Sequence, residues 1–152
     1  MSNQENRLAM LPITVLAQYV KDLSFENPNA PQSLVAGQPA PQVGMGVDVQ
    51  ARQAGEDIFE VELKIRAEAK AGDAMVFLVD LVYAGLFSLP GLPPEHHRPV
   101  LLIEGPRLLF PFARSIVATI TSEGGYPPLL LNPIDFAELY RRQNIPETEG
   151  NA

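Results

Sequence analysis

Apolar and polar residues alternate along four stretches in the first part of the chain, and a period of two is the pattern of a β-strand. The stretches cover residues 13–25, 42–52, 59–70 and 74–87. In the second and third stretches one face is apolar and the other polar, so we expect these strands to have one face toward water. Short turns are expected at residues 53–57 and 71–73, between the strands.

The first and fourth stretches depart from plain alternation. Lys21 interrupts the apolar face of the first strand, which predicts a bulge or a subunit contact at that point. The fourth strand is apolar on both faces apart from Asp80. Strands of this kind are usually covered on both sides, yet the helices of this chain can cover only one side of a sheet. Either a second subunit or a ligand is therefore expected on the other side.

Residues 108–123 have the periodicity of one amphipathic helix of about four turns. The apolar face is formed by Leu109, Phe112, Ala113, Ile116, Val117 and Ile120. Pro111 is expected in the first turn, where its missing N–H costs little, and Gly124-Gly125 is expected to end the helix. Burial of this face contributes on the order of 10 kcal/mol, so the helix must pack against another apolar surface.

A second, shorter helix is expected after the loop 126–131. Asn132 is expected to cap it, with Pro133 at its first position, and it should end before Pro146. The connection 88–106 is rich in proline and glycine and is expected to be irregular, forming the wall of a groove. With a length of 152 residues, the chain is expected to form one domain over residues 11–143, between a disordered N-terminus, 1–10, and a disordered acidic tail, 144–152.

The charge and composition limit the classes of partner. The formal net charge is −7 and there is no cysteine, and the isoelectric point is near 4.7. An acidic protein of this kind is a poor nucleic-acid binder, because phosphate neutralisation needs a basic patch. Basic proteins or unfolded basic segments are better candidates. Without cysteine, disulfides, thiolate-bound zinc and thiol catalysis are excluded.

The segment Leu8–Ala17 has the apolar character of a short signal-peptide core. Only Arg7 precedes it closely, and the sequence continues directly into the first strand pattern, so we interpret it as mature structure. No apolar run approaches the roughly 20 residues needed to span a bilayer. The expected protein is soluble and cytoplasmic, without direct insertion into a membrane.

Motifs for catalysis, metals or nucleotides are weak. His96-His97 is a single pair whose members point apart in extended chain, which favours an exposed loop over a metal site. Gly44-Met45-Gly46 lacks the rest of a dinucleotide fingerprint, and no phosphate-binding loop occurs. Asp22, Glu26 and Asp80 have the surroundings of a solvated acidic face rather than of an acid–base pair. The chain is therefore expected to be a binding module with no cofactor, not an enzyme.

Two surfaces are candidates for binding. An apolar and aromatic set could line a groove for extended polypeptide, where a sheet edge offers backbone pairing: Phe87, Leu92, Phe110, Tyr126, Leu131 and Phe136. The alternative is that these residues pack the helices onto the sheet. The acidic group Asp22, Glu26 and Asp80 could dock a basic partner, or could serve solubility alone.

Three stretches together resemble the SecB family of bacterial protein-export chaperones. They are YVKDLSFENPNAP (19–31), FLVDLVYAGLF (77–87) and LLFPFARSIVATITSEGGYPPLLLNPIDFAELY (108–140). The resemblance implies an α+β fold, a four-stranded antiparallel sheet with two C-terminal helices packed on one face. It also implies a homotetramer, a dimer of dimers, that binds unfolded precursor proteins without ATP. Such a chaperone keeps its clients translocation-competent and delivers them to the SecA motor ATPase.

The resemblance also implies roles for individual residues. SecA docking falls on Asp22, Glu26, Leu78 and Asp80. Tetramer contacts fall on the first strand, the fourth strand and the long helix, at Tyr19, Val79, Leu81, Tyr83, Ile116 and Ile120. A rival interpretation is a small-ligand-binding or catalytic oligomer that uses the same apolar groove, with Asp80 or the histidine pair as its polar group. A third is a chaperone dedicated to one partner, such as a toxin.

Overall fold

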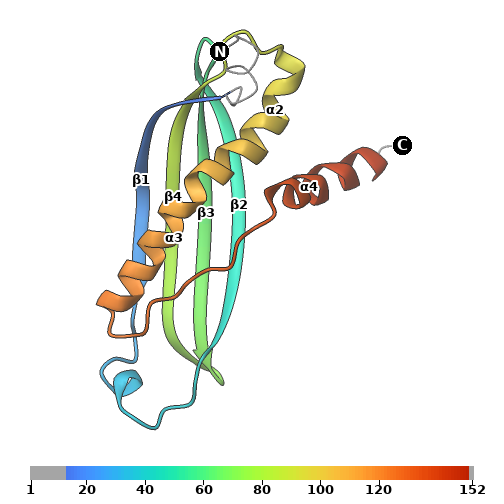
Figure 1. The fold of residues 1–152 in the computed structure, drawn as a ribbon. Coiled ribbons are helices and arrows are strands. Elements are labelled where there is room, and N and C mark those ends of the chain that lie inside the picture. Colours follow the sequence, from blue (N-terminus) through green and yellow to red (C-terminus); the bar gives the residue numbers. More distant parts are fainter. Residues whose placement is uncertain (1–12, 151–152) are drawn as a thin grey trace, which may run out of the picture.

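The computed structural model describes residues 13–150, and it is an α+β fold with one sheet and helices on one side of it. The sheet contains β1 (Thr14–Glu26), β2 (Gln42–Gly55), β3 (Ile58–Ala71) and β4 (Ala74–Ser88). All neighbours are antiparallel and the strand order is β1-β4-β3-β2. The helix α3 (Gly105–Glu123) runs diagonally across one face (Figure 1). The expected fold class is confirmed. The expected N-terminal segment 1–10 lies outside the described residues.

The strand order explains why β4 is apolar on both faces. β4 lies between β1 and β3, whereas β1 and β2 form the two edges of the sheet. The β2–β3 turn needs only residues 56 and 57, and is tighter than the expected 53–57 because the strands extend to Gly55 and start again at Ile58. Gly72, with a φ of +63°, makes the β3–β4 turn.

The interruption at Lys21 is a β-bulge. The register between β1 and β4 shifts between Val20 and Asp22, so Tyr19 lies opposite Ala84 and Asp22 opposite Val82. A one-residue shift exchanges the two faces of a strand. For this reason the side chains of Tyr19 and Asp22 lie on the same face of the sheet although the two residues are three positions apart. We call this face, which points away from α3, the far face.

The connection after β4 is irregular only over residues 89–93, which corrects the expectation that all of 88–106 is irregular. A helical run begins at Pro94 and passes through η2 (Pro94–His96), α2 (His97–Pro99) and the π-helical segment η3 (Val100–Glu104) into α3. The π turn precedes Pro106, whose missing N–H breaks the α-helical bonding pattern, so a local change of pitch keeps the run continuous. Pro111 consequently lies inside α3 and not in its first turn. It is exposed, so water can satisfy the carbonyl that loses its donor.

The second helix also starts and ends later than expected. α4 covers Phe136–Gly150 and continues past Pro146. Its cap is Asp135, whose Oδ1 accepts a hydrogen bond from the backbone N–H of Glu138 at 3.0 Å, and not Asn132. The chain before it is fastened to α3, because the carbonyl of Leu131, a buried residue, accepts a hydrogen bond from Nε of Arg114 at 2.8 Å. The proposed division into a domain, 11–143, and a tail, 144–152, stays a prediction.

The main core lies between the sheet and α3. It contains side chains from β3, β4 and α3 that are almost fully buried: Val61, Leu63, Ile65, Val79, Leu81, Phe87, Leu109, Ala113 and Val117. Gly85 permits close approach of the helix, because a Cβ there would lie 2.7 Å from the Phe87 ring and 2.9 Å from Cδ2 of Leu109. At the start of β2 the helix α3 does not cover the sheet, so Val43 and Met45 remain exposed. No helix in residues 13–150 has the length and apolar character to cross a membrane.

Candidate functional site

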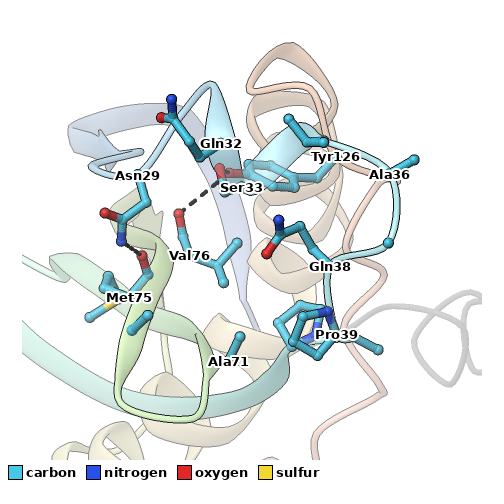
Figure 2. Close-up of a pocket in the computed structure, with 15 residues that line it drawn as sticks. Asn29, Gln32, Ser33, Ala36, Gln38, Pro39, Ala71, Met75, Val76 and Tyr126 are labelled. Carbon is cyan, nitrogen blue, oxygen red and sulfur yellow. Dashed lines mark hydrogen bonds between the residues drawn. The ribbon is translucent and has the colours of Figure 1, made fainter.

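A cavity of about 470 Å³ lies between the β1–β2 connection and the β3–β4 turn (Figure 2). Its walls come from residues 29–41, from the ends of β3 and β4, and from Tyr126 after α3. The residues that line it are Asn29, Gln32, Ser33, Val35, Ala36, Gly37, Gln38, Pro39, Ala40, Pro41, Ala71, Ala74, Met75, Val76 and Tyr126. None of them carries a charge. The cavity therefore suits apolar or neutral side chains.

Tyr126 holds the two sides of this cavity together. Its hydroxyl donates a hydrogen bond to Oδ1 of Asn27 at 2.5 Å. The same hydroxyl lies 2.7 Å from Oγ of Ser33, which can donate to it; Figure 2 shows Tyr126 and Ser33 next to each other. Nδ2 of Asn27 donates to the carbonyl of Gly124 at 3.0 Å. The β1–β2 connection is thus tied to the end of α3. On its inner side the Tyr126 ring contacts the Phe77 ring, with centroids 5.1 Å apart.

Apolar surface continues beyond the cavity. Leu34 and Val35 on the β1–β2 connection are 44% and 57% exposed, and Leu130 on the loop after α3 is 59% exposed. Exposed apolar patches of this kind mark binding surfaces in soluble proteins. The sequence interpretation assigned no binding role to residues 32–41, a proline-containing segment between the first two predicted strands. The signal that could have found them was the apolar pair Leu34-Val35 within a segment otherwise rich in Pro, Ala and Gln.

Only one residue of the groove suggested by the sequence lines this cavity. That residue is Tyr126. Phe87, Leu131 and Phe136 are 0%, 4% and 2% exposed, so they belong to the core in this conformation. The Phe110 and Phe136 rings meet edge to face at 6.0 Å and join α3 to α4. Leu92 is half-buried before the helical run. Within the single chain these residues pack against the core, and their role in a client groove stays a prediction.

The residues assigned to SecA docking lie together on the far face. Glu26 is opposite Leu78, and Ser24 is opposite Asp80, so β1 and β4 present the set side by side. Asp22 and Glu26 are exposed, whereas Leu78 is 8% exposed between its neighbours. Asp80 faces a shallow trough of about 550 Å³ that also contains Asp22 and has Gly46 in its lining. The trough is lined by the carboxylates of Asp22, Asp48 and Asp80 and by the cations Lys64 and Arg66, so three negative charges face two positive ones.

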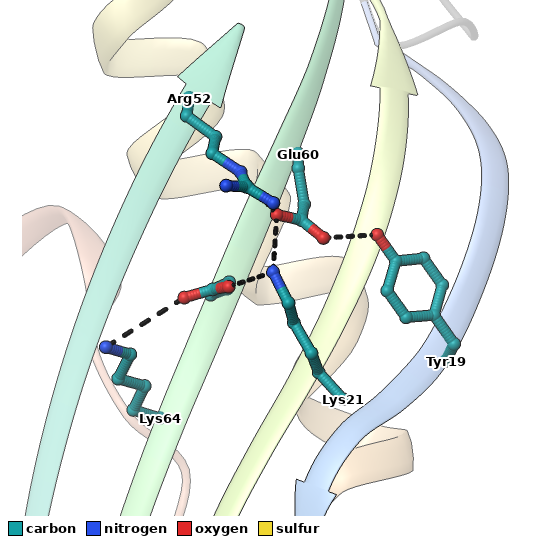
Figure 3. A network of polar contacts seen from close by, with 6 residues as sticks. Tyr19, Lys21, Arg52, Glu60 and Lys64 are labelled. Carbon is teal, nitrogen blue, oxygen red and sulfur yellow. Dashed lines mark hydrogen bonds and ion pairs between the residues drawn. The ribbon is translucent and has the colours of Figure 1, made fainter. Parts of the chain in front are cut away.

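A second polar cluster on the same face surrounds Glu60, which is 6% exposed (Figure 3). Oε2 of Glu60 accepts the Tyr19 hydroxyl at 2.6 Å, and Oε1 accepts Nζ of Lys21 at 2.9 Å and Nε of Arg52 at 2.8 Å. Lys21 also donates to Oε2 of Glu62 at 2.6 Å. The cluster connects both edge strands to β3, and its two carboxylates face three cations, because Nζ of Lys64 also lies 3.9 Å from Oε1 of Glu62. It leaves no unpaired carboxylate for a basic partner.

The cluster shifts the pKa values of its members. Burial raises the pKa of Glu60, but the hydrogen bonds donated by Tyr19, Lys21 and Arg52 together outweigh burial and hold it below its ordinary value. Burial, and then the bond to the Glu60 carboxylate, raises the pKa of Tyr19 to about 12. Both shifts favour one arrangement: a neutral tyrosine donating to an ionised glutamate.

The residues assigned to tetramer contacts divide into two groups. Val79 and Leu81 are 0% and 1% exposed beneath α3, so they are covered within the single chain. Tyr83 is also buried, and its hydroxyl donates to Oε1 of Gln18 at 3.1 Å. Ile116 and Ile120 are half-buried, and Tyr19 belongs to the Glu60 cluster. Val79, Leu81 and Tyr83 therefore lie on the face of the sheet toward α3, whereas Leu78 and Asp80 of the same strand lie on the far face.

Other apolar side chains are exposed near these positions. Val20 and Leu23 on β1 are 46% and 38% exposed, and Phe112 on α3 is 51% exposed. The Phe112 ring stacks on the Tyr83 ring with centroids 6.3 Å apart. The sequence interpretation placed Phe112 on the buried face of the helix. It was wrong because α3 buries a narrower stripe, through Leu109, Ala113 and Val117, and Phe112 lies at its margin.

The histidine pair has a structural place. Nε2 of His97 lies 2.7 Å from the carbonyl of Leu92, to which it can donate, and its ring meets the Phe59 ring edge-on at 5.1 Å. His96 is exposed. Across residues 13–150 no group of three or more His, Cys, Asp or Glu side chains is placed to hold a metal ion.

Comparison with known proteins identifies the family. The family model described as "Preprotein translocase subunit SecB" matches residues 4–146. The chain belongs to the SecB family. A SecB relative named "Protein-export protein SecB" from Rhodospirillum centenum is 57% identical over 143 residues, which is 93% of this chain and 85% of the relative. A SecB relative of the same name from Maricaulis maris is 54% identical over 140 residues, 91% and 81% of the two chains.

A solved SecB-like structure has the same fold. It is the Mycobacterium tuberculosis Rv1957 SecB-like chaperone in complex with a ChAD peptide from the Rv1956 HigA1 antitoxin. It aligns with a TM-score of 0.67 at 17% sequence identity, covering 80% of this chain and 90% of that one. The relatives are protein-export proteins and do not favour the rival interpretation, a small-ligand-binding or catalytic oligomer.

Proposed function

We propose that this SecB-family chain is a protein-export chaperone that works without ATP in the cytoplasm. It binds unfolded precursor proteins, keeps them translocation-competent and delivers them to the SecA motor. The observation that carries the proposal is the uncharged cavity beside exposed apolar residues of the β1–β2 connection. The names and high identity of its SecB relatives support the same role.

Client binding uses many weak apolar contacts. The cavity accepts one apolar side chain of an extended client, and Leu34 and Val35 contact its neighbours. Each buried side chain contributes roughly 1.5 to 3 kcal/mol, while immobilising the client costs a comparable amount. Affinity therefore depends on several sites acting together, and linking them in one particle raises their effective concentration.

The particle that links these sites is a homotetramer, a dimer of dimers. Supporting features are the exposed apolar residues Val20, Leu23 and Phe112, and the unpaired outer edge of β1. These residues extend the contact set beyond Ile116 and Ile120. Four copies carry a formal charge of four times −7, or −28. This charge attracts basic clients, and the attraction weakens as salt is added.

SecA docks on the far face, at Asp22, Glu26, Leu78 and Asp80. The exposure of Asp22 and Glu26 and the charge of the face suit a basic segment of the motor. Because the cavity is lined by other residues, near the end of α3, a client and the motor can be bound at the same time. Delivery then requires no prior release of the client.

Light scattering after size-exclusion chromatography tests the proposal. The protein should elute near four times 16.6 kDa and co-elute with an unfolded precursor, but not with the same precursor folded. Val35→Asp, which places a charge at the cavity, should reduce co-elution. Val43→Asp is the matched control, since Val43 is an exposed valine on β2 that lies outside both the cavity lining and the apolar surface around Leu34, Val35 and Leu130. A monomer that ignores unfolded chains would overturn the proposal.

A further inference from the structure

Asp80 differs from the other two acidic residues proposed for SecA docking. Its Oδ2 and Oδ1 accept hydrogen bonds from Nη1 of Arg66 at 3.0 Å and 3.3 Å. Asp80 and Arg66 lie directly opposite each other on β4 and β3. In the described part of the chain, Asp22 and Glu26 have no ion pair of this kind. One of the three carboxylates is thus already occupied by a cation of the chain itself.

The pair is built so that it can open. The side chains of Arg66 and Asp80 are 52% and 39% exposed, and exposed pairs contribute little to stability. Arg66 has a second partner, because its Nε donates to Oε1 of Glu68 at 3.0 Å. On the β2 side its neighbour is Gly46, where even a Cβ would have no atom within 4 Å. The guanidinium therefore has both another carboxylate and open space to move into.

We propose that Arg66 is a built-in competitor for Asp80: a basic segment of the partner must displace the Arg66 guanidinium before it can bind this carboxylate. The inference rests on the proposed SecA docking. Its consequence is selectivity, because a segment with one positive charge gains little from the exchange, whereas a segment with several engages Asp22 and Glu26 as well and can displace Arg66. The Glu60 cluster does not serve this purpose, since its cations are bound to Glu60 and Glu62.

The test compares two substitutions that change the net charge equally. Arg66→Gln frees Asp80, and we expect it to bind purified SecA about two- to five-fold more tightly, the range for one exposed ion pair. Lys64→Gln removes a cation from the same face of the same strand; Lys64 lies 3.9 Å from Glu62. It should change the affinity less than Arg66→Gln. Titration calorimetry at about 0.1 M salt keeps electrostatic differences measurable.

A double-mutant cycle shows whether Arg66 acts through Asp80. Asp80→Asn should weaken binding, and Arg66→Gln in that background should give no gain. If Asp80→Asn weakens binding but Arg66→Gln alone does not strengthen it, the inference is wrong and the docking proposal stands. If Asp80→Asn changes nothing, both fail. Equal gains from Arg66→Gln and Lys64→Gln would show a general charge effect and overturn the inference. Circular dichroism and light scattering establish that each variant keeps its fold and assembly.

Discussion

The hydroxyl of Tyr19 on the edge strand β1 donates to the carboxylate of Glu60 on β3 at 2.6 Å, across the intervening strand β4. Tyr19 lies opposite Ala84, and this small residue leaves room on the far face for the tyrosine side chain to reach over β4. The bond, together with those from Lys21 and Arg52, ties both edges of the sheet to one buried acid. Tyr19 and Lys21 share this face by the ordinary alternation of a strand, and the register shift after Val20 adds Asp22 to it.

Tyr19→Phe should lower the free energy of unfolding by about 1.5 kcal/mol, because a hydrogen bond to a charged acceptor is lost. Tyr83→Phe is the matched control. It removes a bond to the neutral amide of Gln18 and should cost about 0.5 to 1 kcal/mol. Urea denaturation at a fixed protein concentration measures both. An equal or smaller loss for Tyr19→Phe would contradict a central role of the Glu60 cluster.

The Glu60 cluster should make stability depend on pH in the acid range. The pKa of Glu60 is held below its ordinary value of 4.5, so its contribution is present above about pH 4.5 and is lost as the pH falls through the lowered value. Wild-type protein should therefore be more stable than Glu60→Gln at pH 7, and the difference should shrink below about pH 4.5. Thermal unfolding of both proteins across this range is the measurement. A difference that stays constant to pH 3 would rule out this linkage.

Gly85→Ala should destabilise the fold by about 1 to 3 kcal/mol, since the new Cβ would push into the Phe87 ring and Leu109. Gly46→Ala, on β2, introduces the same methyl group where no atom lies within 4 Å. It should leave stability unchanged or raise it by up to about 1 kcal/mol. Denaturant midpoints of the two variants distinguish close packing from a general effect of replacing glycine. Equal losses would show that the helix does not press on β4 at Gly85.

Phe112→Asp should weaken assembly of the chain without unfolding the monomer, because the ring is half-exposed and stacks on Tyr83. A central aromatic contact typically accounts for a tenfold or larger change in association, so the loss should be on the order of tenfold or more. Phe112→Leu keeps an apolar side chain and should assemble nearly as well. Light scattering over a concentration series measures both. Unaltered assembly of the aspartate variant would remove Phe112 from the contact set.

The prolines were where local pattern and tertiary structure disagreed most. The alternation over residues 42–52 and 59–70 is strong enough to specify strands. Lys21 interrupts the apolar face of the first strand, and this interruption predicted the bulge found there. Pro94, Pro99 and Pro106 suggested an irregular connection instead. In the fold, Leu101 and Leu102 are buried in the core and stabilise a helical run that its prolines oppose. The π-helical segment before Pro106 accommodates the N–H that this proline lacks.

The sequence by itself determined the strands, the long amphipathic helix, the acidic balance and the family resemblance, because these depend on local periodicity and on motifs along the chain. Tertiary structure alone decided which apolar residues are covered. Val79 and Phe87 disappear beneath α3, whereas Phe112 and Val35 stay exposed, although all four are apolar. Likewise the pairing of Asp80 with Arg66 follows from strand register. Burial and charge pairing depend on which strands become neighbours, and a pattern along one strand does not contain that information.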